Sequence, residues 1–81
     1  MSDIRAKVLL VDDDDDFRHV LGERLRHHRF DVSDAADGAE AVRAVRGDRD
    51  LDVVVLDLRM PGTDGEQVLR EIKTHRPEVQ V

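Results

Sequence analysis

The chain has 81 residues, enough for one small domain, and carries a net charge of −6 with 40% hydrophobic and 40% charged residues. The negative charge argues against nucleic-acid binding through this segment, and the absence of cysteine excludes disulfides and thiolate metal sites. No apolar run approaches the ~20 residues that span a bilayer, and the N-terminus lacks an apolar signal segment. We therefore expect a cytoplasmic protein with no membrane partner.

Short apolar runs alternate with helical periods along the chain. Residues 8–11 are continuously apolar and follow Lys7, which predicts a strand over 7–11 buried on both faces. An apolar stripe at helical spacing follows, formed by Phe17, Val20, Leu21 and Leu25. The first element is therefore a strand and the second a helix.

The same alternation continues to the last residue. We predict, in order, a strand over 30–33, a helix with Ala41, Val42 and Val45 inward, a strand over 51–56, a helix with Val68, Leu69 and Ile72 inward, and the start of a fourth strand over 79–81. Thr63 and Glu66 have capping-box spacing at the start of the last helix, and Pro77 ends it. The order βαβαβαβ predicts a doubly wound, flavodoxin-like α/β fold with a parallel sheet and helices on both faces.

Acidic residues follow the first and third predicted strands. In the flavodoxin-like strand order 2-1-3-4-5, the carboxyl ends of strands 1 and 3 border the ligand crevice, so Asp12, Asp13 and Asp57 would converge there. Two unit charges ~4 Å apart repel by about 4 kcal/mol at an effective dielectric of 20. Such a cluster needs protons or a cation, and hard oxygen ligands favour Mg²⁺, with Ca²⁺ or Mn²⁺ as substitutes.

The remaining aspartates of the run have a different interpretation. Asp14, Asp15 and Asp16 stand at a predicted helix N-terminus, where carboxylates cap free N–H groups. Taken alone, Asp12 and Asp13 also fit ordinary turn chemistry. Asp57 at the matching end of the third strand favours the metal site.

The stretches "VLLVDD", "AADGAEAV" and "VVVLDLRMPGTDG" resemble the receiver domain of two-component response regulators, over essentially the whole chain. The resemblance implies a five-stranded α/β sandwich in the order 2-1-3-4-5, with Asp57 as the phosphoacceptor. It also implies that Asp13, Asp57 and the backbone carbonyl of Arg59 ligate Mg²⁺, with Asp12 acting through a bound water. A histidine kinase or phosphotransfer protein would donate the phosphoryl group, and an output domain or partner would receive the signal.

The loop after the third strand has a shaping role in this interpretation. Met60, Pro61, Gly62 and Gly65 are ordinary loop punctuation, and they also suit a rigid loop that directs the Arg59 carbonyl toward the metal. 

Two further expectations concern the molecular surface. Arg18, on the outer side of the first helix, is a candidate contact for a partner kinase. The chain's histidines are expected to be solvated rather than functional: His19, His27, His28 and His75.

The chain also departs from the family pattern. Receiver domains carry a switch Ser or Thr after strand 4 and a Lys after strand 5, and this chain ends at Val81, before either position. We therefore expect residues 1–81 to be an incomplete receiver domain that lacks strand 5 and the last two helices. One sheet face would be partly bare, which predicts self-association through the exposed sheet edge and poor switching.

Two other functions fit the acidic residues less well. A small phosphohydrolase with Asp57 as nucleophile would place a second aspartate two residues later, where this chain has Arg59. A receiver-like interaction module that is never phosphorylated would not require the acidic triad. We favour a phosphoacceptor domain that is not an enzyme.

Overall fold

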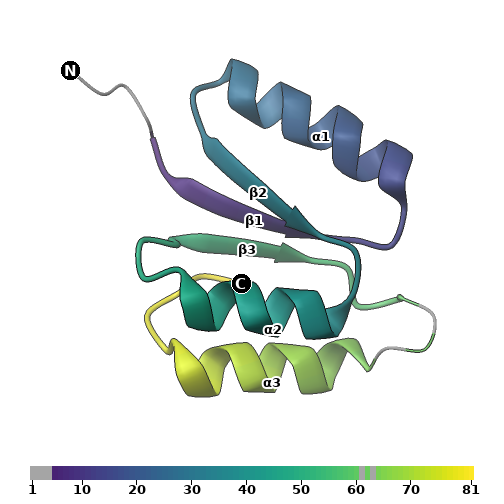
Figure 1. Ribbon diagram of the computed structural model, residues 1–81, viewed down its shortest axis with the longest axis vertical. Coiled ribbons are helices and arrows are strands. Elements are labelled where there is room, and N and C mark those ends of the chain that lie inside the picture. Colours follow the sequence, from purple (N-terminus) through teal and green to yellow (C-terminus); the bar gives the residue numbers. More distant parts are fainter. Residues whose placement is uncertain (1–4, 61, 63) are drawn as a thin grey trace.

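The computed structural model describes residues 5–60, 62 and 64–81, and in this part of the chain strands and helices alternate (Figure 1). The elements are β1 (Lys7–Val11), α1 (Asp15–His27), β2 (Asp31–Ala35), α2 (Gly38–Gly47), β3 (Val53–Leu56) and α3 (Gly65–His75). None of these helices combines the length and the apolar character that crossing a bilayer requires.

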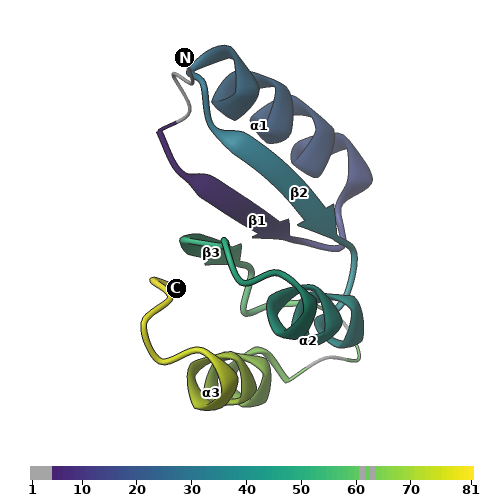
Figure 2. The ribbon, with the colours of Figure 1, turned by 60° about the vertical axis from the view of Figure 1, so that its left-hand side comes forward.

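The sheet has the order β2-β1-β3, and β1 pairs in parallel with both neighbours. Figure 2 shows α1 on one face of the sheet and α2 with α3 on the other. The predicted fold class is confirmed for these strands, including the reversal of strand order between β1 and β3.

Each face of the sheet has its own core because side chains alternate along β1. Leu9 and Val11 face α2 and α3, whereas Val8 and Leu10 face α1. The larger core, under α2 and α3, contains Leu9, Val11, Ala35, Ala41, Val45, Leu51, Val54, Met60, Val68, Ile72 and Val79. The smaller core, under α1, is built on Val8, Leu10 and Val32.

Strand boundaries differ from the prediction at two places. The second strand extends to Ala35 rather than ending at Ser33, because its pairing with β1 continues to the Val11–Ala35 register. The third strand begins at Val53, although Leu51 is already buried. Tertiary pairing therefore sets both limits, and apolar character alone does not.

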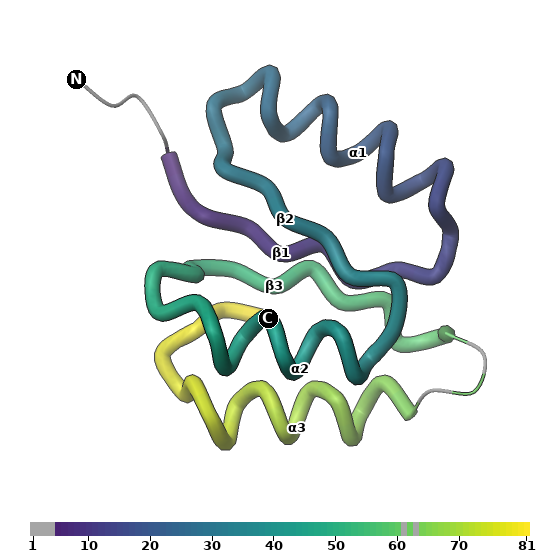
Figure 3. The backbone as a smooth tube through the Cα atoms, viewed as in Figure 1, coloured from purple at the N-terminus to yellow at the C-terminus, as the bar shows by residue number. Residues whose placement is uncertain are grey.

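The predicted fourth strand forms only a single bridge. Gln80 pairs in parallel with Val53, and its backbone carbonyl accepts a hydrogen bond from the Val54 N–H at 2.7 Å. The tube in Figure 3 follows the last residues back to the outer side of β3. Residues 79–81 are therefore placed beside β3 without forming a strand.

Aspartates cap all three described helices. Asp14 accepts from the Phe17 N–H at the start of α1, and Asp37 accepts from the Glu40 N–H at the start of α2. The cap of α3 is Asp64, so the predicted capping box of Thr63 and Glu66 is wrong; Thr63 itself lies outside the described residues.

The capping prediction for the aspartate run is confirmed only in part. Asp14 is the cap of α1, whereas Asp15 and Asp16 lie in the first helical turn. Acidic groups in a first turn still suit the helix dipole.

The apolar stripe of α1 is only half covered. Leu21 and Leu25 pack on the smaller core, but Phe17 and Val20 are 51% and 57% exposed. The stripe is therefore uncovered at its N-terminal end, where no described element packs over Phe17 and Val20.

Candidate metal and phosphoacceptor site

The candidate site lies where β1 and β3 end at the same edge of the sheet. Asp12 directly follows β1 and Asp57 directly follows β3. The Asp57 N–H donates to the Val11 carbonyl at 3.0 Å, and the Asp12 N–H donates to the Ala35 carbonyl at 3.2 Å. The sheet hydrogen bonding thus continues past the strand ends and fixes both main chains.

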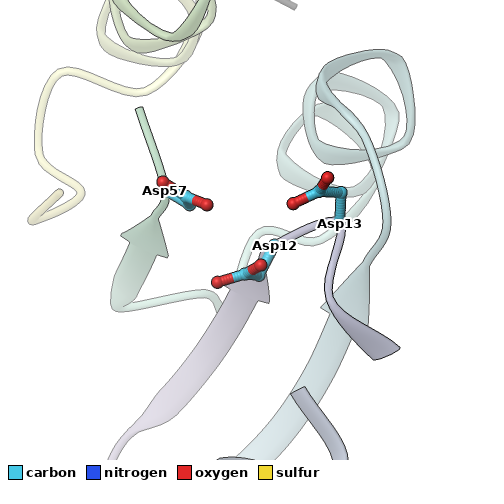
Figure 4. A group of neighbouring side chains, drawn as sticks. All are labelled: Asp12, Asp13 and Asp57. Atoms are coloured by element: carbon cyan, nitrogen blue, oxygen red, sulfur yellow. The ribbon is translucent and has the colours of Figure 1, made fainter. Parts of the chain in front are cut away.

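Three carboxylates meet at this edge. One carboxylate oxygen from each of Asp12, Asp13 and Asp57 lies within 4.8 Å of the other two. Figure 4 shows Asp13 and Asp57 turned toward one another across a space that Asp12 borders. The predicted convergence of side chains from two strands is present.

Local hydrogen bonds orient two of these carboxylates. The Oδ1 atom of Asp12 accepts from the Asp14 N–H, and Oδ1 of Asp57 accepts from the Arg59 N–H, each at 2.9 Å. Both aspartates are half-buried, and Asp13 is exposed. One oxygen of each half-buried carboxylate is therefore held by the loop that follows its strand, which leaves the other available to a ligand.

Arg18 lies beside this cluster rather than on the outer surface. Its side chain is only 13% exposed, and its Nη1 atom donates to the Asp12 carbonyl oxygen at 2.6 Å. The same guanidinium donates to Asp34 at 2.9 Å and to Asp15 at 2.6 Å. These bonds, with Asp34 first, raise the pKa of Arg18 above its usual value, so the side chain stays charged.

The expectation that Arg18 lies on the outer side of the first helix is therefore wrong. The sequence did hold one signal for its true environment, because Asp15 precedes Arg18 by three residues on the same helix face. The contacts to Asp34 and to the Asp12 carbonyl depend on the β1–β2 pairing and had no local signal. The histidines are exposed, as expected.

An apolar groove of about 320 Å³ begins at the acidic cluster and runs between α1 and β3. Phe17 and Leu21 form one wall, Val55 and Leu56 form the other, and Asp12, Arg18 and Asp57 also border it. Phe17 and Val55 are 51% and 44% exposed. This groove is the partly bare sheet face that the sequence predicts.

The loop after β3 packs tightly where it meets α3. Met60 is buried, and Gly62 has a φ of 71°, a backbone conformation that favours glycine. A Cβ on Gly65 would lie 2.6 Å from the Leu58 Cα, so only glycine allows α3 to begin there. Pro61 lies outside the described residues. 

The donor set fits a divalent cation of the magnesium type. Mg²⁺ binds oxygen at about 2.1 Å, so its neighbouring ligands lie about 3 Å apart and its opposite ligands about 4.2 Å apart. Carboxylate oxygens within 4.8 Å of one another can supply two direct ligands and a third through a water without moving the strands. The exposure of Asp13 leaves room for the waters that Mg²⁺ retains.

Comparison with known proteins identifies the family to which this chain is similar. The model of the response regulator receiver domain matches residues 8–81. The transcriptional regulatory protein PrrA of Mycobacterium tuberculosis is 41% identical over 75 residues, which cover 93% of this chain and 32% of PrrA. The chain therefore spans about a third of the length of this curated relative.

Solved structures give the same result. A response regulator receiver domain protein from Clostridium thermocellum superposes with a TM-score of 0.86 at 31% identity, covering 91% of this chain and 60% of that one. The response regulator TrrA from Thermotoga maritima, in complex with Mg²⁺ and BeF, superposes with a TM-score of 0.81 at 32% identity, covering 89% of this chain and 62% of that one.

Proposed function

Because this chain belongs to the response regulator receiver domain family, a regulatory part of two-component systems, we propose that Asp57 is its phosphoacceptor and that the neighbouring aspartates bind Mg²⁺. The observation that carries the proposal is the convergence of carboxylates from β1 and β3 on one space. A histidine kinase or a phosphotransfer protein is the proposed donor.

Asp57 is the nucleophile in this proposal. A carboxylate oxygen of Asp57 bonds to phosphorus while the bond from phosphorus to the donor atom breaks, and the donor atom keeps the electron pair. The Arg59 N–H donates to Oδ1 of Asp57 and so helps to fix the orientation of the attacking carboxylate. The protein otherwise supplies position and charge neutralisation, which are what phosphoryl transfer requires.

The other residues have binding and positioning roles. Asp13, Asp57 and the Arg59 backbone carbonyl are the proposed direct ligands of Mg²⁺, and Asp12 is proposed to act through a water. When bound, Mg²⁺ supplies the positive charge that lets an anionic carboxylate approach an anionic phosphoryl group. The Mg²⁺ and BeF complex of TrrA supports this assignment by similarity.

The loop residues are proposed to hold this arrangement in place. The close contact of Gly65 with Leu58 and the positive φ of Gly62 support a rigid path from Asp57 to α3. Met60 anchors the same loop in the larger core, and Pro61 is assigned to this group from the sequence. A rigid loop would keep the Arg59 carbonyl directed toward the cation.

The proposal is tested by intact mass after incubation with acetyl phosphate and Mg²⁺. We expect the wild-type protein to gain the mass of one phosphoryl group and Asp57→Asn to gain none. Asp16→Asn is the matched control, because Asp16 is an exposed member of the same aspartate run and lies outside the triad. Asp16→Asn should be labelled like the wild type, and labelling of Asp57→Asn would contradict the proposal.

The same experiment separates the alternative functions. A phosphohydrolase would consume many equivalents of acetyl phosphate per chain, whereas a phosphoacceptor stops after about one. An interaction module that is never phosphorylated would show no labelling and no dependence on Mg²⁺.

A further inference from the structure

Arg18 lies beside the acidic cluster, and the family resemblance assigns no role in the chemistry to this cation. Its guanidinium contacts three segments at once: the Asp12 carbonyl after β1, Asp34 near the end of β2, and Asp15 in the first turn of α1. The contact to the Asp12 carbonyl is partly buried. Asp15 and Asp34 are 82% and 54% exposed, so each of these ion pairs alone contributes little.

The two exposed ion pairs orient the guanidinium group of Arg18. Arg presents a rigid planar fork of donors, and fixing Nε and Nη2 on two carboxylates fixes where Nη1 points. Nη1 then holds the Asp12 carbonyl, which belongs to the peptide unit that joins Asp12 to Asp13. That peptide unit sets the directions in which both side chains leave the main chain.

We propose that Arg18 is a positioning residue: its guanidinium fixes the Asp12–Asp13 peptide and thereby sets the spacing of the acidic cluster for a divalent cation. The inference rests on the proposed function of that cluster. It assigns to Arg18 no contact with the phosphoryl group or the metal.

When Arg18 is replaced, its charge and its positioning role predict opposite changes in cation affinity, which makes the proposal testable. A positive side chain beside three carboxylates repels a bound cation, so its loss alone should strengthen cation binding. Misplacement of the carboxylates should weaken binding, and changes to groups that orient metal ligands typically cost 10–100-fold in affinity.

Arg26 offers a matched control on the same helix. Its Nη1 atom pairs with Glu23, three residues earlier, as Arg18 pairs with Asp15, and its Nη2 atom donates to the Val32 carbonyl of β2 at 3.1 Å. Arg26 therefore makes the same kinds of contact two helical turns away from the acidic cluster. Replacing either Arg by Lys keeps the charge and removes the fork.

The experiment measures Mn²⁺ affinity by electron paramagnetic resonance in the full-length protein for wild type, Arg18→Lys and Arg26→Lys. We expect Arg18→Lys to weaken Mn²⁺ binding about tenfold and Arg26→Lys to leave it unchanged. Equal affinities of Arg18→Lys and wild type would overturn the proposal. If Arg18→Lys does not fold, Arg18→Gln decides the question: weaker binding supports positioning, and unchanged or tighter binding refutes it.

A second measurement needs no metal. The Asp14 N–H bonds to Oδ1 of Asp12, so its hydrogen exchange reports the order of the acidic loop. We expect faster exchange at Asp14 in Arg18→Lys than in Arg26→Lys, and equal rates would refute the positioning role. A wild-type protein that binds no Mn²⁺ would refute the proposed metal site, while the exchange result would still decide the role of Arg18.

Discussion

Lys7 and Asp48 form a salt bridge of 2.8 Å that ties the start of β1 to the residue after α2. The Lys7 hydrogen bond is the main cause that lowers the pKa of Asp48, and the same contact raises the pKa of Lys7. Because both groups are partly exposed, screening by solvent limits the contribution of the pair.

The lowered pKa of Asp48 makes the stability of the fold depend on pH. A carboxyl group with a depressed pKa stabilises the fold above its unfolded value of about 3.9, and that stabilisation is lost as pH falls through the lower folded value. We expect Lys7→Met to reduce the Tm at pH 7 and to have the same Tm as wild type at a pH below the folded pKa of Asp48. Arg5→Met, which removes an exposed cation from the same segment, is the control. A Tm difference that persists in acid would contradict this assignment.

Arg76 connects the end of α3 to the segment between α2 and β3. It lies at the end of the sheet where β3 begins, opposite the end that carries the acidic cluster. It directly follows α3, its side chain is 15% exposed, and it donates to the carbonyls of Asp48 at 2.6 Å and Arg49 at 2.8 Å. It also pairs with Glu78. The segment between α2 and β3 has no regular pairing of its own, so these bonds satisfy carbonyl groups that would otherwise depend on water.

We expect Arg76→Lys to lower the free energy of unfolding by about 1–3 kcal/mol, because a single ammonium cannot satisfy the same carbonyls. Urea unfolding followed by circular dichroism measures the change. Arg70→Lys is the matched control, since Arg70 is an exposed residue on α3. Equal unfolding midpoints for the two variants would show that the Arg76 contacts do not stabilise the fold.

The elements could be predicted from the sequence because the hydrophobic period changes clearly along the chain. Residues 7–11 were predicted with their observed limits, since the unbroken apolar run after Lys7 is typical of a central strand that is covered on both faces. The start of α3 was misplaced by one residue, because Thr63 and Asp64 are adjacent residues that can both cap a helix. Local chemistry does not choose between two such neighbours.

The candidate site was predictable for a related reason. Asp12, Asp13 and Asp57 follow strands whose carboxyl ends border one crevice in the flavodoxin-like strand order, so their convergence followed from the predicted fold class. The position of Arg18 was not predictable, because its partner Asp34 was predicted to lie beyond the second strand rather than within it. To predict long-range contacts of a flexible side chain, one must know the register in which the strands pair, and the sequence pattern does not provide that register.

At the scale of the whole molecule, the two faces of the sheet are unequally covered. The face under α2 and α3 holds the larger core, whereas on the side of α1 Phe17, Val20 and Val55 are exposed, and Phe17 and Val55 line the groove. Within the described residues, the outer edge of β3 is paired only at the Val53–Gln80 bridge. Apolar side chains beside a free strand edge favour association.

We therefore expect the 81-residue chain to self-associate, with a sedimentation coefficient that rises with concentration. Phe17→Ser combined with Val55→Thr should reduce the association, because both side chains line the groove. Val81→Thr is the control, since Val81 is similarly exposed and lies outside the groove. Monomeric behaviour of the unsubstituted chain across the concentration range would refute this expectation.

Asp12 and Asp57 belong to the acidic cluster and also line the groove. If Asp57 is phosphorylated as proposed, the phosphoryl group would add nearly two negative charges at that boundary, and charge disfavours apolar neighbours that cannot solvate it. An apolar partner that fits the groove beside unmodified Asp57 would therefore bind less well after phosphorylation. Phosphorylation at Asp57 would then change the binding properties of the groove directly, because Asp57 itself lines the groove.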